Sequence, residues 1–371
     1  MALPALTQDE LTRYSRHLLI PSVGEEGQRR LKASSVLLVG VGGLGCPAAL
    51  YLAAAGVGRI GLVDPDRVER SNLQRQILFG EASVGEWKTT AAARRLHDIN
   101  PAVALDLHTL RFTPENALQL AEGYDLIIDG SDNFPTRFLT CDTAYFLKKP
   151  LVHAAIQRFE GQATVFTPHL GGPCYRCLLP ASPPPGAVPS CAEAGVLGVL
   201  PGILGSMQAM EAIKLLLQLG EHPSDRMLCY DALRSSFRNV RLKKDPRCPL
   251  CGENPTITSV HNQETSAPTA CATAAVPAIT PAELRELLDA GFSGILIDVR
   301  EPREHIASSI PGARLIPLAT LPDAVAEIPR HLEIIVHCQS GGRSARATMW
   351  LLDHGFSRVR NLTGGIQAWR V

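Results

Sequence analysis

The chain has 371 residues, of which 45% are hydrophobic and 19% are charged, and this length and composition favour two ordinary globular domains. Lys and Arg number 36 and Asp and Glu also number 36, so the net charge of zero gives no support for binding to nucleic acid or to a membrane surface. The N-terminus has no basic stretch followed by an apolar one, so we expect no signal peptide and a cytoplasmic location.

The first 250 residues predict apolar strands that alternate with amphipathic helices. The pattern Thr7-x-x-Glu10 resembles a capping box and predicts a short helix at the start. Strands are expected near 35–40, 59–63, 103–107, 124–129 and 151–155, and helices near 44–55, 88–99, 114–121 and 133–147. This alternation is typical of a parallel α/β sheet with right-handed crossovers. Further strands are expected near 160–167, 227–231 and 237–242.

The longest nearly uncharged run begins at Ala194 and continues into an apolar helix expected at 202–219. Glycines and prolines interrupt the run, which is too short for a comfortable membrane span. It predicts a buried helix, either in the core or at a dimer interface.

A glycine loop follows the first expected strand. Its sequence is Gly40-x-Gly42-Gly43-x-Gly45, and after the next helix a second strand ends at Asp64. This is a Rossmann fingerprint, in which the glycines let the backbone approach a phosphate and the acid binds ribose hydroxyls. The fingerprint alone is also typical of NAD- or FAD-binding proteins.

The residues after Asp64 favour a triphosphate instead. The run Ser-Asn-Leu-Gln-Arg-Gln contains Asn72 and Arg75, a cationic segment that suits attack on the α-phosphorus of a nucleotide and that a hydride-transfer enzyme does not need. Asp132 follows the strand expected at 124–129, where it could hold Mg²⁺ beside the phosphates. The alternative is that Asp132 caps the helix that starts near Asn133.

Two Cys-x-x-Cys pairs predict a metal site. Cys174 with Cys177 and Cys248 with Cys251 would supply four thiolates to one tetrahedral Zn²⁺. Four protein ligands close the coordination sphere, so this zinc is expected to be structural.

Residues 253–278 are rich in Ala, Thr, Ser and Pro, have no periodic pattern and predict a flexible linker. A second α/β unit begins at Ile279, with strands expected near 294–298 and 332–336 and helices near 281–289 and 344–353.

The second unit contains a candidate nucleophile. A strand leads to Cys338 in a glycine-rich loop, and Arg343 precedes a helix. Loop amides and a helix N-terminus stabilise a thiolate or a persulfide. Thiol phosphatases place five residues between the cysteine and the arginine, whereas this chain has four, so the loop favours sulfur transfer.

The run Ser-Asn-Leu-Gln-Arg-Gln after Val-Asp-x-Asp resembles the ubiquitin-activating-type adenylyltransferases, and in particular the branch that activates sulfur carriers for molybdopterin and thiamine synthesis. The resemblance covers residues 6–252. It implies that Lys88, otherwise a typical surface lysine, contacts ATP phosphates and that Arg16 reaches into the nucleotide site of the other subunit of a homodimer. It also implies that Cys191 lies on a crossover loop and can bond to carrier or sulfur, against the alternative of a packed thiol.

Residues 279–371 resemble a rhodanese. The resemblance rests on the Cys338 loop, on the Leu-Ile-Asp-Val-Arg-Glu run at 296–301, on Ser-Ile-Pro-Gly-Ala at 309–313 and on the segment 362–369.

Together these resemblances imply an α/β protein with a Rossmann-like adenylation domain at 1–252, a linker at 253–278 and a rhodanese domain at 279–371. The expected cofactors are ATP, Mg²⁺ and Zn²⁺. The expected partners are a ubiquitin-like sulfur carrier ending in Gly-Gly and a persulfide donor such as a cysteine desulfurase. Adenylation of the carrier and transfer of sulfur from a Cys338 persulfide would give a thiocarboxylate. An NAD-dependent oxidoreductase with an accessory sulfur domain and a non-catalytic carrier-docking scaffold are the alternatives.

Overall fold

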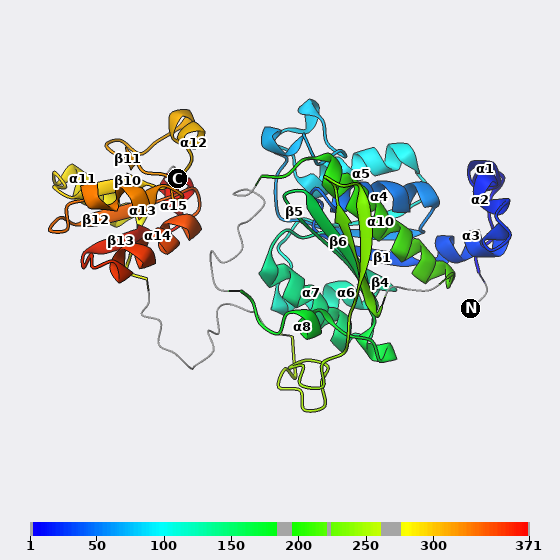
Figure 1. The fold of residues 1–371 in the computed structure, drawn as a ribbon. Helices are drawn as coiled ribbons and strands as arrows, with labels where there is room; N and C mark the ends of the chain where they lie inside the picture. The colour runs from blue at the N-terminus through cyan, green and yellow to red at the C-terminus, as the bar shows by residue number, and fades with distance from the viewer. Residues whose placement is uncertain (1–2, 184–194, 221–223, 261–275, 370–371) are drawn as a thin grey trace. The chain divides into compact units, whose positions relative to one another are not determined.

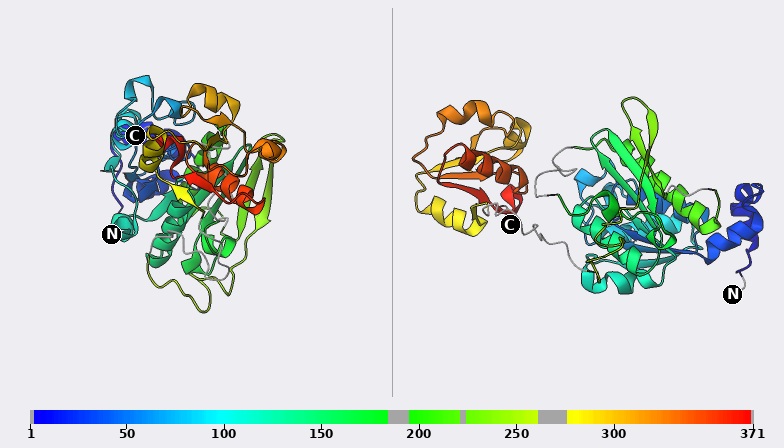
Figure 2. Two further views of the ribbon diagram at one scale, coloured as in Figure 1. Left: turned by 90° about the vertical axis from the view of Figure 1, so that its left-hand side faces the viewer. Right: turned by 60° about the horizontal axis from the view of Figure 1, so that its bottom comes forward.

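A computed structural model describes residues 3–183, 195–220, 224–260 and 276–369 (Figure 1). The chain divides into two compact units, of which the first includes residues 3–182 and 195–260 and the second includes 276–369. Both units are α/β, as the sequence predicts. The turned views in Figure 2 show that each sheet has helices on both of its faces.

The first unit is built on an eight-stranded sheet in the order β3-β2-β1-β4-β5-β6-β7-β8. Its parallel strands are β1 (Ser35–Val39), β2 (Arg59–Val63), β3 (Ala104–His108), β4 (Leu126–Asp129) and β5 (Leu151–Gln157). Three antiparallel strands extend it: β6 (Glu160–Phe166), β7 (Arg226–Asp231) and β8 (Ser236–Arg241). The strand order changes direction at β1, because β2 and β3 lie on one side of it and β4 and β5 on the other. The crevice at the carboxyl ends of β1 and β4 is therefore a topological switch point.

Alternating side chains of the central strands pack into two separate cores. Val36 and Leu38 face a core shared with α4 (Gly45–Ala55), α5 (Lys88–Ile99) and α10 (Val199–Leu217). Leu37 and Val39 face the opposite core, beneath α6 (Pro114–Glu122) and α7 (Phe134–Phe146). The sheet is therefore buried on both faces, which explains why its parallel strands are nearly uninterrupted apolar runs.

Shorter helices complete the first unit. They are α1 (Gln8–Arg13), α2 (Ser15–Leu18), α3 (Gly24–Ala33) and α8 (Tyr175–Leu178). The expected capping box is present, because the Thr7 side chain accepts from the Glu10 N–H and the Glu10 carboxylate accepts from the Thr7 N–H.

Helix α10 begins three residues before its expected start and ends two residues earlier. By length and hydropathy alone it could cross a membrane, but it packs against α4 and against β5 and β6. One side of it is a core surface, whereas Val199 and Met210 on the other side are exposed.

The second unit has a five-stranded parallel sheet in the order β11-β10-β12-β13-β9. The strands are β9 (Ala278–Ile279), β10 (Ile295–Asp298), β11 (Arg314–Leu315), β12 (Ile334–His337) and β13 (Val359–Leu362). The helices are α11 (Pro281–Asp289), α12 (Pro302–Ala307), α13 (Leu321–Ala324), α14 (Gly342–Asp353) and α15 (Gly365–Trp369). The two expected strands correspond to β10 and β12, and the two expected helices to α11 and α14.

The start of the expected linker packs against the first unit. Ile257 is buried, and the N–H groups of Thr256 and Ile257 both bond to the Pro249 carbonyl. Residues 261–275 lie outside the described residues, so for them the linker stays a prediction.

Two glycines on α10 test its packing. A Cβ on Gly205 would overlap the Leu44 carbonyl and approach the Pro47 ring at 2.5 Å, whereas a Cβ on Gly202, one turn earlier, has no atom within 4 Å. We expect Gly205→Ala to destabilise the first unit by about 1–3 kcal/mol through overpacking. The matched Gly202→Ala should be neutral or stabilising by up to about 1 kcal/mol, because alanine favours helix. Calorimetry of the full chain measures both, and equal effects would contradict the α10–α4 contact.

Candidate functional site

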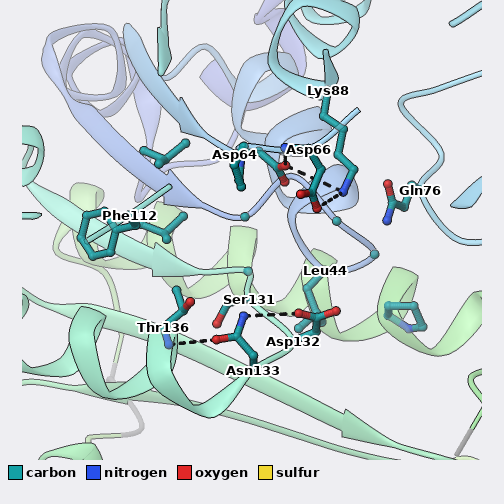
Figure 3. A pocket seen from close by; sticks show the side chains of 18 of the residues that line it. Leu44, Asp64, Asp66, Gln76, Lys88, Phe112, Ser131, Asp132, Asn133 and Thr136 are labelled. Carbon is teal, nitrogen blue, oxygen red and sulfur yellow. Dashed lines mark hydrogen bonds and ion pairs between the residues drawn. The ribbon is translucent and has the colours of Figure 1, made fainter. Parts of the chain in front are cut away.

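A pocket opens at the switch point of the first sheet, beyond the carboxyl ends of β1, β2 and β4 (Figure 3). Most of the expected nucleotide ligands line it: Gly40, Gly42, Gly43, Asp64, Arg75, Lys88 and Asp132. These residues come from five separate segments, and only the folded sheet brings them together.

The glycine loop is shaped by backbone crowding. Gly40 has a φ of +93°, and a Cβ on Gly130 would lie 2.5 Å from the Gly40 carbonyl oxygen. A Cβ on Gly45 would overlap that same oxygen. Gly45 thus allows the close packing of the turn, whereas Gly42 and Gly43 line the pocket. Gly40, Gly42 and Gly43 therefore present backbone to the pocket near the N-terminus of α4, which favours an anion.

Asp64 is fixed by backbone donors. Its carboxylate accepts from the Val41 N–H at 2.8 Å and from the Asp66 N–H at 2.9 Å. Burial raises the pKa of Asp64, and the nearby Lys88 opposes that shift. The acid is therefore rigidly placed at the end of β2, where a ribose would be bound.

Lys88 is the first residue of α5, and it is not a surface lysine. Its side chain is 8% exposed, and its ammonium lies 3.0 Å from Asp66 and 3.8 Å from Asp64 (Figure 3). The carboxylates of Asp64 and Asp66 thus fix the Lys88 ammonium at the pocket wall.

Asp132 does not cap α7. Asn133 is the cap, because its side-chain oxygen accepts from the Thr136 N–H at 3.0 Å. Asp132 is exposed in the pocket, with Asn133 Nδ2 3.5 Å from its carboxylate. A carboxylate beside a phosphate cradle is the donor type that Mg²⁺ uses, so this residue fits the expected metal role.

Asp129, by contrast, is structural. It is fully buried, accepts from both the N–H and the hydroxyl of Ser131, and lies 2.8 Å from His153 Nδ1. Burial acts to raise the pKa of Asp129, but the His153 contact, the charge of Arg137 and the Ser131 hydrogen bond together leave the pKa lowered. The ionised Asp129 fixes the loop that presents Asp132.

Two of the other expected site residues do not line this pocket, and a third is not described. Asn72 is buried and bonds to the Glu69 N–H in a 3₁₀ turn, so it shapes the segment that carries Arg75 and does not line the pocket. Arg16 is exposed on α2 and does not line the pocket of its own chain. Cys191 lies outside the described residues.

The pocket also has lining residues that the sequence did not single out as ligands. They include Asp66, Gln76, Arg111, Phe112, Asn133, Thr136 and Arg137. Gln76 is buried, and its Oε1 has no hydrogen-bond partner among the described residues. Arg137 lies one helical turn after the N-cap Asn133. Its spacing from Ser131-Asp132-Asn133 along the expected helix was the sequence signal that it faces the same side as these residues. Arg111 and Phe112 follow β3 in an irregular segment that carries no such pattern.

The four expected zinc ligands converge. The sulfur atoms of Cys174, Cys177, Cys248 and Cys251 all lie within 4.8 Å of one another, with separations that include 3.4, 3.5 and 3.9 Å. Sulfur atoms around a tetrahedral zinc are about 3.8 Å apart. The donor set and spacing are therefore compatible with one structural Zn²⁺.

A buried ion pair supports this cluster. Arg176, between Cys174 and Cys177, forms a bidentate pair with Asp142 of α7 at 2.6 and 2.7 Å. Both side chains are at most 1% exposed. The cysteine turn is thus anchored to the helix that follows Asp132.

In the second unit, Cys338 follows β12 directly and is fully buried. Its sulfur accepts from the Gly341 N–H at 3.1 Å and from the Ser344 hydroxyl at 3.4 Å. Gly341 has a φ of +97°, and α14 begins at the next residue. The loop therefore directs donors at the sulfur, which favours its anionic forms.

Arg343, expected to act in catalysis, is bound to a carboxylate. Its guanidinium forms two hydrogen bonds to Glu304, at 2.7 and 2.8 Å. A second arginine, Arg300, is 3.4 Å from the Gln339 side chain and is paired with Asp298 at 2.7 Å. Neither Glu304 nor Asp298 was expected from the sequence to belong to the site.

Comparisons with known proteins agree with this division. The ThiF family model matches residues 14–250, and the rhodanese-like domain model matches 280–371. A Mycobacterium tuberculosis protein named Probable adenylyltransferase/sulfurtransferase MoeZ is 47% identical over 98% of this chain and 94% of its own length. The Sulfur carrier protein adenylyltransferase of Thermus thermophilus is 55% identical over 67% of this chain and 94% of its own length. The Adenylyltransferase and sulfurtransferase MOCS3 of Sus scrofa is 43% identical over 98% of this chain and 86% of its own.

Among solved structures, E. coli MccB has the same fold as the first unit. It superimposes with a TM-score of 0.58 at 21% identity, covering 67% of this chain and 75% of that chain.

The cysteine cluster yields a prediction about metal. We expect about one zinc per chain, and we expect Cys174→Ala or Cys248→Ala to lose zinc and lower the Tm of the first unit, because removing one ligand opens a closed site. Cys229→Ala is the matched control, since Cys229 lies outside the cluster. Metal analysis and thermal melts decide it, and full stability of the zinc-ligand variants would contradict the site.

Proposed function

The chain belongs to the ThiF family and continues into a rhodanese-like domain, so it is an adenylyltransferase and sulfurtransferase, and we propose that the pocket of the first unit and the Cys338 loop are its two reaction centres. The observation that carries the proposal is the convergence of the glycine loop, Asp64, Lys88 and Asp132 on one pocket of the ATP-using unit.

The substrate of the first reaction is proposed to be a ubiquitin-like sulfur carrier whose C-terminus is Gly-Gly. The relatives named for sulfur-carrier adenylation support this choice. The terminal carboxylate of the carrier attacks the α-phosphorus of ATP, the bond to pyrophosphate breaks, and an acyl-adenylate forms. The carboxylate is already a nucleophile, so this step needs no general base.

The cations of the pocket would offset the charge that develops on the phosphates. Glycine-loop amides, Arg75 and Lys88 supply positive charge from one chain. Asp64 would bind the ribose, and Phe112 offers an aromatic surface at the pocket wall. Asp132 would hold a Mg²⁺ ion, whose charge supports the same phosphates.

A homodimer would add Arg16 of the partner subunit to the site. Arg16 is exposed and stands outside the pocket of its own chain. Val199 is 63% exposed, Met210 is 57% exposed and Leu19 is 72% exposed, so the first unit offers apolar surface for a partner.

The second reaction is proposed to use sulfur carried on Cys338. A persulfide donor such as a cysteine desulfurase transfers a sulfane sulfur to the Cys338 thiolate. The terminal sulfur of the Cys338 persulfide then attacks the acyl-adenylate carbonyl, AMP leaves, and carrier and Cys338 are joined by an acyl disulfide. A thiol, which Cys191 could supply, attacks the Cys338 sulfur and releases the thiocarboxylate. An external dithiol then reduces the disulfide left on the enzyme.

A reducing location, such as the cytoplasm, suits this chemistry. The eight cysteines among the described residues are all free, and four of them form the thiolate cluster. Thiolate zinc sites and persulfide carriers both need thiols that stay reduced.

ATP–pyrophosphate exchange tests the first centre. Exchange should require a carrier with an intact C-terminus, and Asp132→Ala should slow it more than about tenfold, a loss above about 1.4 kcal/mol of transition-state stabilisation. Asp98→Ala is the matched control, because Asp98 is an exposed acid outside the pocket. Exchange without carrier, or an unchanged Asp132→Ala rate, would reject the assignment.

The same assay tests the action of Arg16 across subunits. Arg16→Ala and Asp132→Ala proteins should each be impaired, and mixing them should restore part of the exchange through hybrid dimers with one intact site. A monomeric wild type in sedimentation, with no complementation, is the contrary result.

The division of labour between the units gives a separate prediction. Cys338→Ala should keep pyrophosphate exchange and yet make no thiocarboxylate in the reconstituted reaction, because every proposed ATP ligand lies in the first unit. Intact mass should show one added sulfur on the wild-type second unit and none on the variant. Thiocarboxylate formed by Cys338→Ala at the wild-type rate, without free sulfide, would remove Cys338 from the mechanism.

A further inference from the structure

Two arginines are associated with the loop that carries Cys338, and each is paired with a carboxylate. Arg343 is the second residue of α14 and precedes Ser344, whose hydroxyl donates to the Cys338 sulfur. Its guanidinium is held by both oxygens of Glu304. Arg300 contacts the Gln339 side chain, and Asp298 holds its guanidinium through Nε and Nη2.

Glu304 is held in place for this pairing before any sulfur donor arrives. It lies in the first turn of α12, where its Oε2 also accepts from the Glu301 N–H at 2.9 Å. The Arg343 side chain lowers the pKa of Glu304, so the carboxylate stays ionised at neutral pH. The side chains of Arg343 and Glu304 are 15% and 26% exposed, so the pair is shielded from bulk solvent but still reachable.

The carboxylates paired with these arginines change which sulfur donors can bind at the loop. An arginine that follows such a loop, as Arg343 does at the start of α14, would ordinarily offer its guanidinium fork to an oxyanion such as the sulfonate of thiosulfate. Here the fork is already filled by Glu304, and the sulfonate would meet a carboxylate as well as a cation. A persulfide donor has no oxyanion on its reacting sulfur and needs no such fork.

We infer that Glu304 selects the class of sulfur donor: by occupying the Arg343 guanidinium it disfavours thiosulfate and leaves the Cys338 loop to persulfide sulfur. This inference rests on the proposed role of Cys338 as sulfur acceptor. Glu304 acts through Arg343 and is a specificity-determining residue, not a catalytic one.

The two competing reactions differ in their leaving groups. In both, the Cys338 thiol loses its proton to solvent and the thiolate forms an S–S bond to the sulfane sulfur. With thiosulfate, the sulfur–sulfur bond to the sulfonate breaks and sulfite leaves with the electron pair. With a persulfide, the bond to the donor thiol breaks and that thiol leaves as a thiolate. Neither route consumes an oxidant or a reductant.

Glu304→Gln is the variant that isolates the charge. Glutamine can still accept from the Glu301 N–H, so the capping box of α12 is kept. The neutral side chain no longer compensates Arg343, and we expect kcat/KM for thiosulfate to rise about tenfold, mostly through a lower KM. With cysteine persulfide as donor, the rate should change less than about twofold. Persulfide formation on the full chain is read by intact mass and by sulfite release.

Two further variants separate selectivity from structure. Glu304→Asp keeps the charge and should keep thiosulfate disfavoured. In the double variant Glu304→Gln with Arg343→Gln, the thiosulfate gain should vanish, because the guanidinium that Glu304 binds is gone. Glu333→Gln removes a different ion pair, to Arg360, at the opposite end of β12 from Cys338 and should leave the donor ratio unchanged.

Each result decides the inference. A rise in the thiosulfate-to-persulfide ratio in Glu304→Gln that the double variant abolishes supports it. An unchanged ratio, or a parallel loss with both donors, overturns it while leaving Cys338 as the sulfur carrier. A wild type that gains no sulfur from either donor overturns the proposed function as well.

Discussion

The first unit depends on a contact between backbones. The loops after β1 and β4 meet where Gly130 lies against the Gly40 carbonyl, and α4 starts beneath the same oxygen at Gly45. No side chain fits between these segments, so the carboxyl ends of two neighbouring strands approach closely. That approach brings the amides of one loop opposite Asp132 of the other. The pocket thus depends on the close approach of the loops that follow β1 and β4 at the switch point.

Charge inside both units is handled by pairing. Lys88 lies between Asp64 and Asp66, Asp129 holds His153, and Arg176 is bound by Asp142. In the second unit, Asp298 with Arg300 and Glu304 with Arg343 follow the same rule. Buried or half-buried charges of this kind cost desolvation, and their hydrogen-bonded partners offset that cost. The pairs also leave each functional side chain with a defined orientation before a substrate binds.

Much of this arrangement could be predicted from the sequence, because its signals are local. Apolar runs and glycine spacing placed the strands of the first sheet, and the two Cys-x-x-Cys pairs predicted the four-cysteine cluster. The very short strands β9 and β11 have two residues each, too few to show any period. Asn72 was expected to be a ligand, but its side chain caps a turn. The sequence does not separate these two roles, because an amide side chain suits both. Glu304 could not be found because its partner is 39 residues away and only the packing of α12 near α14 joins them.

The cysteine cluster joins two segments that are far apart in the chain. It links residues 174–177 to 248–251, so everything between them, including α10, β7 and β8, lies inside a closed loop. Fixing the ends of a loop this long removes conformational freedom from the unfolded chain. The cluster also marks where the first unit ends, since Cys251 stands only nine residues before the last described residue of that unit, Val260. Because Cys251 precedes the whole second unit in the chain, both cysteine turns emerge from the ribosome before the sulfur-carrying unit does.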